Sequence, residues 1–159
     1  MDSIRAVEKG DITALKKVLD SIELFPSEML DDMIADYFNN PHSEDIWFTA
    51  IEKAEAISIA YCAPEKLTNG TYNLYAIGVR SDLQDKGIGG KMMDYLENLL
   101  REKGHRILIV ETSGTPDLEL TREFYRKKGY TQEASIREFW DEGDDKIIFW
   151  KSLKESKKS

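Results

Sequence analysis

Three glycines, Gly87, Gly89 and Gly90, stand near the middle of the chain between two apolar segments. The segment before them reads as a strand, and the segment after them has the apolar spacing of a helix. Glycine lets a backbone approach a ligand closely and adopt positive φ. Because the first N–H groups of a helix lack internal partners and carry positive partial charge, this position predicts a phosphate-binding loop. The same glycines would also suit a tight turn that binds nothing.

Two common glycine motifs do not match this loop. A P-loop requires Gly-x4-Gly-Lys-Ser/Thr, but Asp85 and Met92 stand where its first Gly and its Ser/Thr should be. A dinucleotide fingerprint requires Gly-x-Gly-x-x-Gly, and Met92 occupies its last position. Nucleotide hydrolysis and nicotinamide chemistry therefore lose support.

The elements that must position the loop follow from hydrophobic periodicity. A strand at 3–7 is followed by a helix that Asp11 should cap and that ends near residue 21, and a second helix is expected at 27–39. Short strands rich in β-branched and aromatic residues come next and indicate an antiparallel meander, with an Asn-Gly turn before the last of them. These strands are expected at 45–52, 56–63 and 71–79.

The pattern changes after residue 80. Helical spacing predicts a helix over 89–104 with Gly104 as its C-cap, and a buried strand over 106–112. A strand, a crossover helix and a second strand form a right-handed parallel unit, so strands 71–79 and 106–112 should be parallel. The last expected elements are a helix at 117–128 and a hairpin of strands at 130–140 and 146–153.

The predicted fold class is therefore an α/β (α+β) domain with a mixed, mostly antiparallel sheet of six to seven strands and flanking helices. A length of 159 residues fits one domain, expected at 1–153, with a Lys/Ser-rich disordered tail at 154–159. The net charge of −8 disfavours nucleic acid as a partner and would attract a cationic substrate such as an amine.

Other classes of protein are disfavoured by what the sequence lacks. The longest apolar run, near 107–110, is too short to cross a bilayer, and no signal-peptide pattern opens the chain, so a cytoplasmic location without membrane association is expected. Cys62 is the single cysteine, which excludes a disulfide framework and a Cys-based metal cluster. We expect no metal site, and we expect Cys62 to be an inert buried thiol.

The segment Gln84-Asp85-Lys86-Gly87-Ile88-Gly89 fits the pattern Gln/Arg-x-x-Gly-x-Gly/Ala. It resembles the acetyl-CoA signature of the GNAT N-acetyltransferase superfamily, here as a single-domain member. The stretch from Arg122 to Tyr130 also looks like the Phe-Tyr-x-x-x-Gly-Phe/Tyr block of that family. The opening strand and helix, the strands at 74–79 and 107–111 and the helix between them extend the resemblance over most of the chain.

The resemblance implies a cosubstrate, acetyl-CoA, and a place for it. In the family the strand before the loop splays from its neighbour, and the pantetheine arm fills the gap by bonding to backbone groups, here those of Ile77 and Val79. Gly78 would suit a bulge in this strand, where a side chain would crowd the cofactor. The pyrophosphate would be held by the backbone N–H groups of Gln84, Asp85, Lys86, Gly87, Ile88, Gly89 and Gly90. Lys86 and Lys91 could add charge near the phosphates.

The implied reaction is transfer of an acetyl group to a primary amine by direct attack through a ternary complex. Tyr125 matches the general-acid tyrosine of the family, close to the cofactor, although it could instead be a core aromatic. Glu111 is the candidate general base because it ends an apolar strand, although it could be a solvated carboxylate while water serves as the base. Many relatives carry Asn where this chain has Asp117, which cannot donate the amide hydrogen bond and which could cap its helix instead.

The acceptor class stays open between a small cationic molecule and a protein amine. Acidic residues on one helix could receive a cationic amine or could simply be a solvated face: Glu28, Asp31, Asp32 and Asp36. The alternative function is an acyl-CoA-binding sensor or interaction module without efficient catalysis. A homodimer is also open, since dimers are common among relatives.

Overall fold

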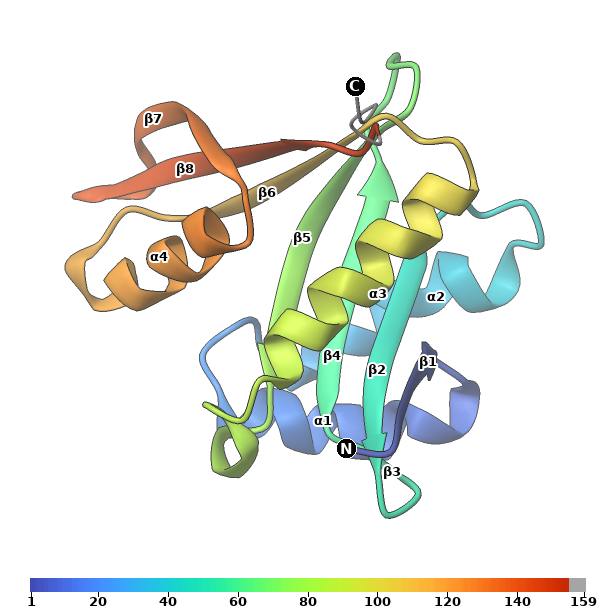
Figure 1. Cartoon of the computed structure of the whole chain (residues 1–159). Helices are drawn as coiled ribbons and strands as arrows, with labels where there is room; N and C mark the ends of the chain where they lie inside the picture. The colour runs from blue at the N-terminus through green and yellow to red at the C-terminus, as the bar shows by residue number, and fades with distance from the viewer. Residues whose placement is uncertain (155–159) are drawn as a thin grey trace. The chain divides into compact units, whose positions relative to one another are not determined.

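The computed structural model describes residues 1–154 of the chain, and of the expected tail only Lys154 lies within them. The helices are α1 (Ile12–Ser21), α2 (Leu30–Asn39), α3 (Ile88–Glu102) and α4 (Glu119–Lys127). The strands are β1 (Ser3–Ala6), β2 (Ile46–Glu52), β3 (Glu55–Ala56), β4 (Ser58–Pro64), β5 (Thr71–Val79), β6 (Ile107–Ser113), β7 (Thr131–Asp141) and β8 (Asp144–Ser152) (Figure 1). None of the helices in the described part of the chain is long and apolar enough to cross a membrane.

The strands within residues 1–154 form an open, mostly antiparallel sheet in the order β1-β2-β4-β5-β6-β8-β7, with β3 paired to β2. This confirms the predicted mixed α/β fold class. Backbone contacts divide the chain into two compact units. The first comprises Met1–Pro64 and Tyr75–Asn98, and the second comprises Glu65–Leu74 and Leu99–Ser159. The expectation of one domain over 1–153 stays a prediction, and the units are described separately below.

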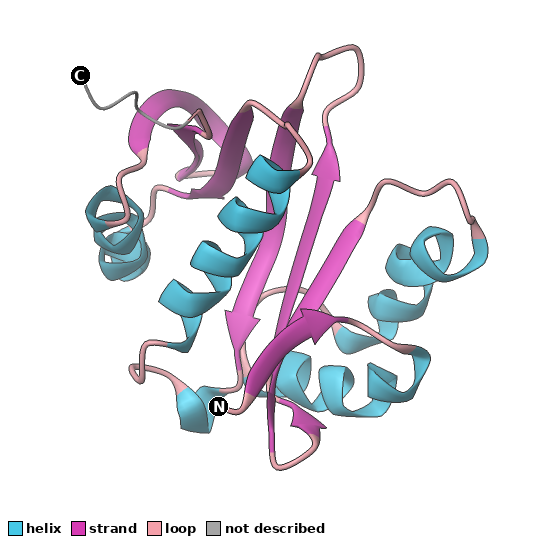
Figure 2. Cartoon of the chain, turned by 45° about the vertical axis from the view of Figure 1, so that its right-hand side comes forward, coloured by secondary structure: helices cyan, strands magenta, loops and turns pink. Residues whose placement is uncertain are grey.

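The first unit has helices on both faces of its strands (Figures 1 and 2). Side chains alternate between the faces of a strand, so neighbours on β2 enter different cores. Trp47 packs with Leu15 and Val18 of α1 and with Ile34 of α2. Phe48 points the other way, and its ring lies 5.1 Å from that of Tyr95 on α3. The two helical layers therefore bury both faces of the same strands.

The second unit is built on β6, which has a neighbouring strand on each side. Residues Thr71–Leu74 of β5 pair with it in parallel, in the register Thr71↔Ile107, as the strand-helix-strand pattern predicted. On the other side β8 pairs antiparallel, with Glu111 opposite Ile148. Helix α4 packs against β8 through aromatic side chains, since the Tyr125 and Phe149 rings lie 5.5 Å apart. The unit thus holds α4 and the end of β6 in fixed relation.

The sheet has one strand more than the expected six to seven. Lys53 and Ala54 have φ values of 50° and 62°, and they turn the chain so that β3 pairs with the end of β2. Left-handed turn residues are usually Gly, Asn or Asp, so the sequence carried no signal for this hairpin. The remaining elements lie within a few residues of their predicted bounds.

Neither aspartate that was considered as a helix cap makes a side-chain cap hydrogen bond, although Asp11 does occupy the N-cap position of α1. Asp11 makes no side-chain cap bond to α1, because its carboxylate accepts hydrogen bonds from the Arg5 guanidinium at 2.7 and 3.0 Å and from the Glu8 N–H at 2.8 Å. Asp117 is exposed and lies inside a 3-10 turn, Pro116–Leu118, that precedes α4. Its helix begins without a side-chain cap hydrogen bond.

Candidate active site

The glycine loop leads from the end of β5 into α3 in the first unit. Gly87 has φ +81°, and its carbonyl accepts the N–H of Lys91 at 3.2 Å, which makes Gly87 the residue just before the helix. The N–H groups of Ile88, Gly89 and Gly90 therefore precede the first intrahelical donor and point out of the helix end. A Cβ at Gly87 would meet no atom within 4 Å. Open space therefore lies beside Gly87 at a helix start with positively polarised N–H groups, an arrangement that fits a phosphate.

Buried side chains hold this loop at each end. Leu83 is 8% exposed and Ile88 is 6% exposed, so both anchor the loop to the core. Between them Asp85 adopts φ +62°, a left-handed conformation that aspartate tolerates better than most residues. Lys86 and Lys91 are exposed, and neither forms an ion pair within residues 1–154. Both stay available to an anion at the helix start.

The side chain of Gln84 points back toward β5. Its Nε2 donates a hydrogen bond of 3.0 Å to the carbonyl of Val79. One step along the chain, Arg80 is fixed by Asp82 at 2.7 Å, which holds the pKa of the exposed Asp82 carboxyl below its ordinary value. These polar side-chain contacts therefore hold the loop against the end of the strand.

The end of β5 contains the two residues expected to bond the pantetheine arm. Ile77 and Val79 are both partly exposed. Gly78 between them was interpreted as room for the cofactor, but its neighbour in the structure is Ile22. A Cβ at Gly78 would lie 2.4 Å from Ile22 Cδ1 and 3.4 Å from Leu24 Cδ2. Packing against the segment after α1 therefore accounts for this glycine.

Tyr125 lies near the end of α4 in the second unit and is 3% exposed. The helix closes with a Schellman motif, in which Gly129 N–H bonds the Arg126 carbonyl at 3.0 Å and Tyr130 N–H bonds the Tyr125 carbonyl at 3.0 Å. Phe149 and Tyr130 contact the Tyr125 ring with centroids at 5.5 and 5.8 Å. Burial raises the pKa of the Tyr125 phenol well above its ordinary value, so the hydroxyl remains a proton donor.

Glu111, near the end of β6, forms an ion pair with Lys146 of β8. Exposed fractions of the side chains are only 13% for Lys146 and 11% for Glu111. Two rings cover the ammonium group, that of Phe139 at 4.2 Å and that of Trp140 at 5.6 Å. Trp140 is itself fixed by a 3.2 Å hydrogen bond from its Nε1 to the Thr112 carbonyl. Glu111 is therefore a shielded, paired carboxylate rather than a solvated one.

Sequence reasoning did not identify Lys146 as a site residue. It is an ordinary lysine in a strand, and its partner is 35 positions away in the sequence (146 − 111 = 35). The pairing of β6 with β8 brings the two together, and that register has no local signature. Hairpin residues Phe139 and Trp140, 50% and 46% exposed, complete the cluster.

Contacts within the chain involve several other residues that were considered from the sequence. Cys62 is fully buried, and burial raises the pKa of its thiol, as expected of an inert cysteine. The acidic residues of α2 and the turn before it are all exposed, but Asp31 pairs with Lys16 at 2.8 Å and Asp36 accepts the Ser43 hydroxyl at 2.8 Å. Among residues 1–154, no group of three or more His, Cys, Asp or Glu side chains is placed to hold a metal ion.

Residues 12–130 match the model of the acetyltransferase (GNAT) family. The chain belongs to this family. The assignment made from the glycine loop and the Phe-Tyr block is thereby confirmed. No curated protein sequence matches the chain.

Solved structures agree with the family. A protein assigned to the GNAT family from Desulfovibrio desulfuricans has 27% identity and a TM-score of 0.88, with 96% of this chain and 99% of that chain covered. Ribosomal-protein-S18-alanine N-acetyltransferase from Escherichia coli has 17% identity and a TM-score of 0.79, over 100% and 98% of the two chains. An aminoglycoside 6'-N-acetyltransferase complexed with coenzyme A has 17% identity and a TM-score of 0.79, over 98% and 99%. The last two likenesses establish the fold alone.

Proposed function

We propose that this GNAT-family protein is an acetyl-CoA-dependent N-acetyltransferase that moves an acetyl group to a primary amine by direct attack. The observation that carries the proposal is the start of α3. Gly87 is left-handed with open space beside it, and Ile88, Gly89 and Gly90 present backbone N–H groups that the helix does not use. Such a helix start fits the pyrophosphate of coenzyme A.

The residues that would hold acetyl-CoA follow from this fit. The backbone from Gln84 to Gly90 would bind the pyrophosphate, with Lys86 and Lys91 adding charge, and the backbone of Ile77 and Val79 would bind the pantetheine arm. Acetyl-CoA supplies an activated acetyl group as a thioester. Two solved structures whose names mention coenzyme A or acetyl-CoA have the same fold and support this choice. They are an aminoglycoside 6'-N-acetyltransferase and a Salmonella typhimurium protein.

Tyr125 is proposed as the general acid. Its raised pKa keeps the phenol protonated, so it can give its proton to the sulfur that leaves. Glu111 is proposed to receive the proton of the amine, directly or through water. The Glu111 carboxylate is paired with the Lys146 ammonium group. For Glu111 to accept a proton, this ion pair must therefore open, or a water molecule must carry the proton from the amine to the carboxylate. The acceptor is a small cationic amine or a protein amine.

The test is release of thiol from acetyl-CoA with a panel of amines, comparing the native protein with Tyr125→Phe. We expect saturable acetyl-CoA binding by both proteins and turnover by the native protein, and we expect Tyr125→Phe to lose roughly 10²- to 10⁴-fold in kcat. Binding without turnover on any amine would instead identify a sensor of acyl-CoA. Absence of binding by well-folded protein would refute the proposed cosubstrate.

A further inference from the structure

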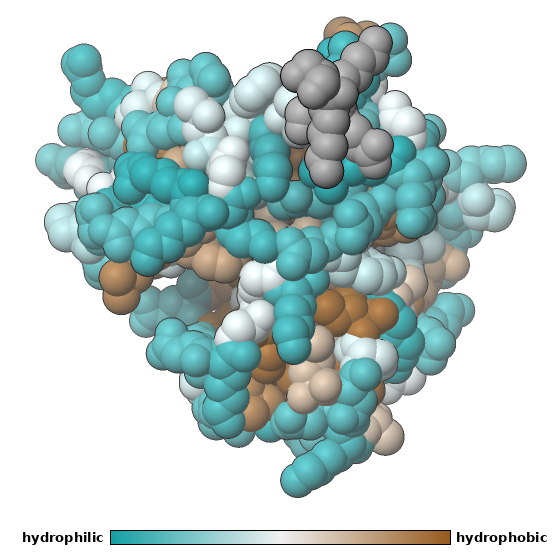
Figure 3. Space-filling view, in the orientation of Figure 1, coloured by the Kyte–Doolittle hydropathy of each residue, from teal (hydrophilic) through white to brown (hydrophobic). Residues whose placement is uncertain are grey.

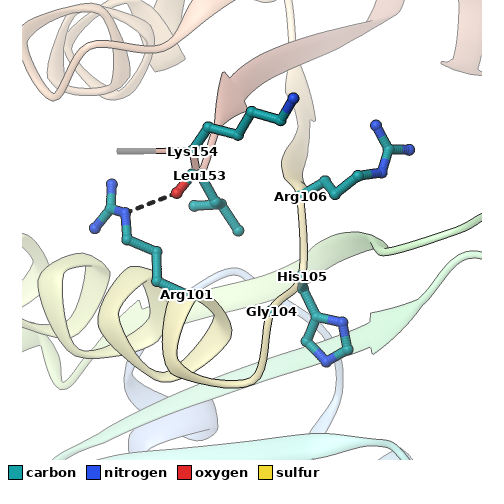
Figure 4. Close-up of a pocket in the computed structure, with 6 residues that line it drawn as sticks. All are labelled: Arg101, Gly104, His105, Arg106, Leu153 and Lys154. Atoms are coloured by element: carbon teal, nitrogen blue, oxygen red, sulfur yellow. Dashed lines mark hydrogen bonds between the residues drawn. The ribbon is translucent and has the colours of Figure 1, made fainter. Parts of the chain in front are cut away.

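A pocket of about 310 Å³ lies in the second unit, where α3 ends and β6 begins, beside the end of β8. It is called the basic pocket here and is lined by Arg101, Gly104, His105, Arg106, Leu153 and Lys154 (Figure 4). Three of these residues are permanent cations, and none is acidic. The whole chain has a net charge of −8, and hydrophilic side chains cover much of the face seen in Figure 3. The lining of the basic pocket is therefore cationic although the chain as a whole is acidic.

The helix end does not account for all three of these cations. The end of α3 is closed by its own backbone, since Gly104 N–H bonds the Arg101 carbonyl at 2.9 Å and His105 N–H bonds the Leu100 carbonyl at 3.0 Å. This is a Schellman motif with Gly104 at φ +79°. A cation in the last turn, such as Arg101, favours the helix dipole. Arg106 and Lys154 lie beyond the helix and have no such role.

The two arginines are held in place by main-chain carbonyls. Arg101 Nε donates to the Leu153 carbonyl at 3.1 Å, and Arg106 Nε donates to the Asn69 carbonyl at 2.6 Å. Figure 4 shows Arg101 on one side of Leu153 and Arg106 on the other. An anchored guanidinium loses less conformational entropy when it binds an anion, and its fork matches phosphate and carboxylate oxygens. Two anchored guanidinium groups in one pocket suit a ligand with more than one anionic group.

Within residues 1–154, the cationic groups of Arg106 and Lys154 have no counterion. Both side chains are exposed, and neither forms an ion pair with any residue described between 1 and 154. Leu153 is 2% exposed and adds an apolar side chain to the lining of the pocket. Charge, fixed geometry and a hollow are thus present together.

We propose that the basic pocket binds a small oligoanion, a ligand that carries two or more phosphate or carboxylate groups. The site is separate from the proposed general base. Arg106 and Glu111 stand near opposite ends of the same strand, about 17 Å apart at the usual rise per residue. The proposal therefore stands or falls independently of acetyl transfer.

The test is calorimetry with tripolyphosphate and with citrate at low ionic strength, in the presence and absence of saturating acetyl-CoA. We expect saturable one-to-one binding that acetyl-CoA does not displace and that salt weakens. Arg106→Gln and Lys154→Gln should each weaken it by about fivefold or more, since each removes one exposed charge-assisted contact. Lys103→Gln removes the same charge from the same helix end outside the pocket and should leave the affinity unchanged.

The two probes separate the sources of the anion. Tighter binding of tripolyphosphate assigns the pocket to a phosphorylated ligand, and tighter binding of citrate assigns it to a polycarboxylate. Binding that acetyl-CoA abolishes would place the anion at the start of α3 and overturn the proposal. Equal losses in Lys103→Gln and Arg106→Gln would overturn it too, because they would indicate diffuse attraction of charge. The proposal would also be overturned if neither tripolyphosphate nor citrate bound the native protein saturably.

Discussion

Lys146 of β8 and Glu111 of β6 form a shielded ion pair, with the Phe139 ring 4.2 Å from the ammonium nitrogen. Glu111 is the predicted general base, and its carboxylate has a counterion that sequence reasoning did not include. A shielded carboxylate depends on its partner, because little water is present to solvate it.

Removal of one partner should therefore destabilise the protein. Lys146→Met leaves the Glu111 carboxylate without its counterion and should lower the free energy of unfolding by about 3 kcal/mol. The double variant Glu111→Leu with Lys146→Met removes both charges and should regain most of that loss. Denaturant unfolding of both variants checks this, with Lys103→Met as an exposed control. A loss in Lys146→Met no larger than in the control would show that the pair contributes little.

The ionisation of Tyr125 gives a prediction about pH. Burial raises its pKa, so the phenol should stay protonated beyond its usual midpoint near 10. Between about pH 8 and 10, phenolate absorbance of the folded protein should be the same in the native chain and in Tyr125→Phe. Ionisation of Tyr125 should therefore cause no decrease in the turnover rate between about pH 8 and 10. A difference spectrum that develops below about pH 10 would contradict the assignment of a buried acid.

Substitution of Gly87 tests whether the start of α3 binds acetyl-CoA, once the effect of backbone strain is controlled for. Its φ is +81°, so Gly87→Ala should cost about 1 kcal/mol of stability even though the added Cβ meets no atom. Gly143→Ala is a matched control, because Gly143 has φ +75° and equally open surroundings in the β7–β8 turn. Thermal unfolding should show similar losses in both, and calorimetry should show weaker acetyl-CoA binding only in Gly87→Ala. Equal acetyl-CoA affinity in the two variants would remove the helix start from the site.

The role of Gly78 is tested by its neighbour. Gly78→Ala places a Cβ 2.4 Å from Ile22 Cδ1 and should cost about 1–2 kcal/mol. Ile22→Val removes that Cδ1 atom, so the double variant should be no less stable than Ile22→Val alone. Denaturant unfolding of the three variants measures the coupling. Additive losses would mean that something other than Ile22 requires a glycine here.

Asp11 should make stability depend on pH in the acid range. The hydrogen bonds from Arg5 lower the pKa of the Asp11 carboxyl in the folded state, so the unfolded chain binds more protons as pH falls. This stabilisation is complete at pH values above the pKa of Asp11 in the unfolded chain, near 3.9, and it is lost as pH falls through the pKa of Asp11 in the folded protein. Because Arg5 is partly exposed, we expect about 1 kcal/mol. Asp11→Asn should flatten the pH dependence of unfolding relative to the native chain, whereas Asp20→Asn, an exposed change on α1, should not.

The sequence predicted most elements because their signals are local. The bounds of β5, Thr71–Val79, were predicted without error, and the parallel pairing with β6 followed from the intervening helix. Gly104 and Gly129 marked the ends of α3 and α4, since a left-handed residue after a helix is most easily a glycine. The turn at Lys53 and Ala54 was missed because non-glycine residues took positive φ, a choice that the surrounding sheet imposes.

The sequence by itself determined the family, the fold class and the glycine loop at the start of α3, because each rests on residue types at short spacing. Only the tertiary structure decided that Glu111 is paired with Lys146, that Gly78 makes room for Ile22, and that Arg101, Arg106 and Lys154 share one pocket. The physical reason is that these relationships join residues distant in the chain. Strand register and helix packing set them, and neither leaves a local mark in the sequence.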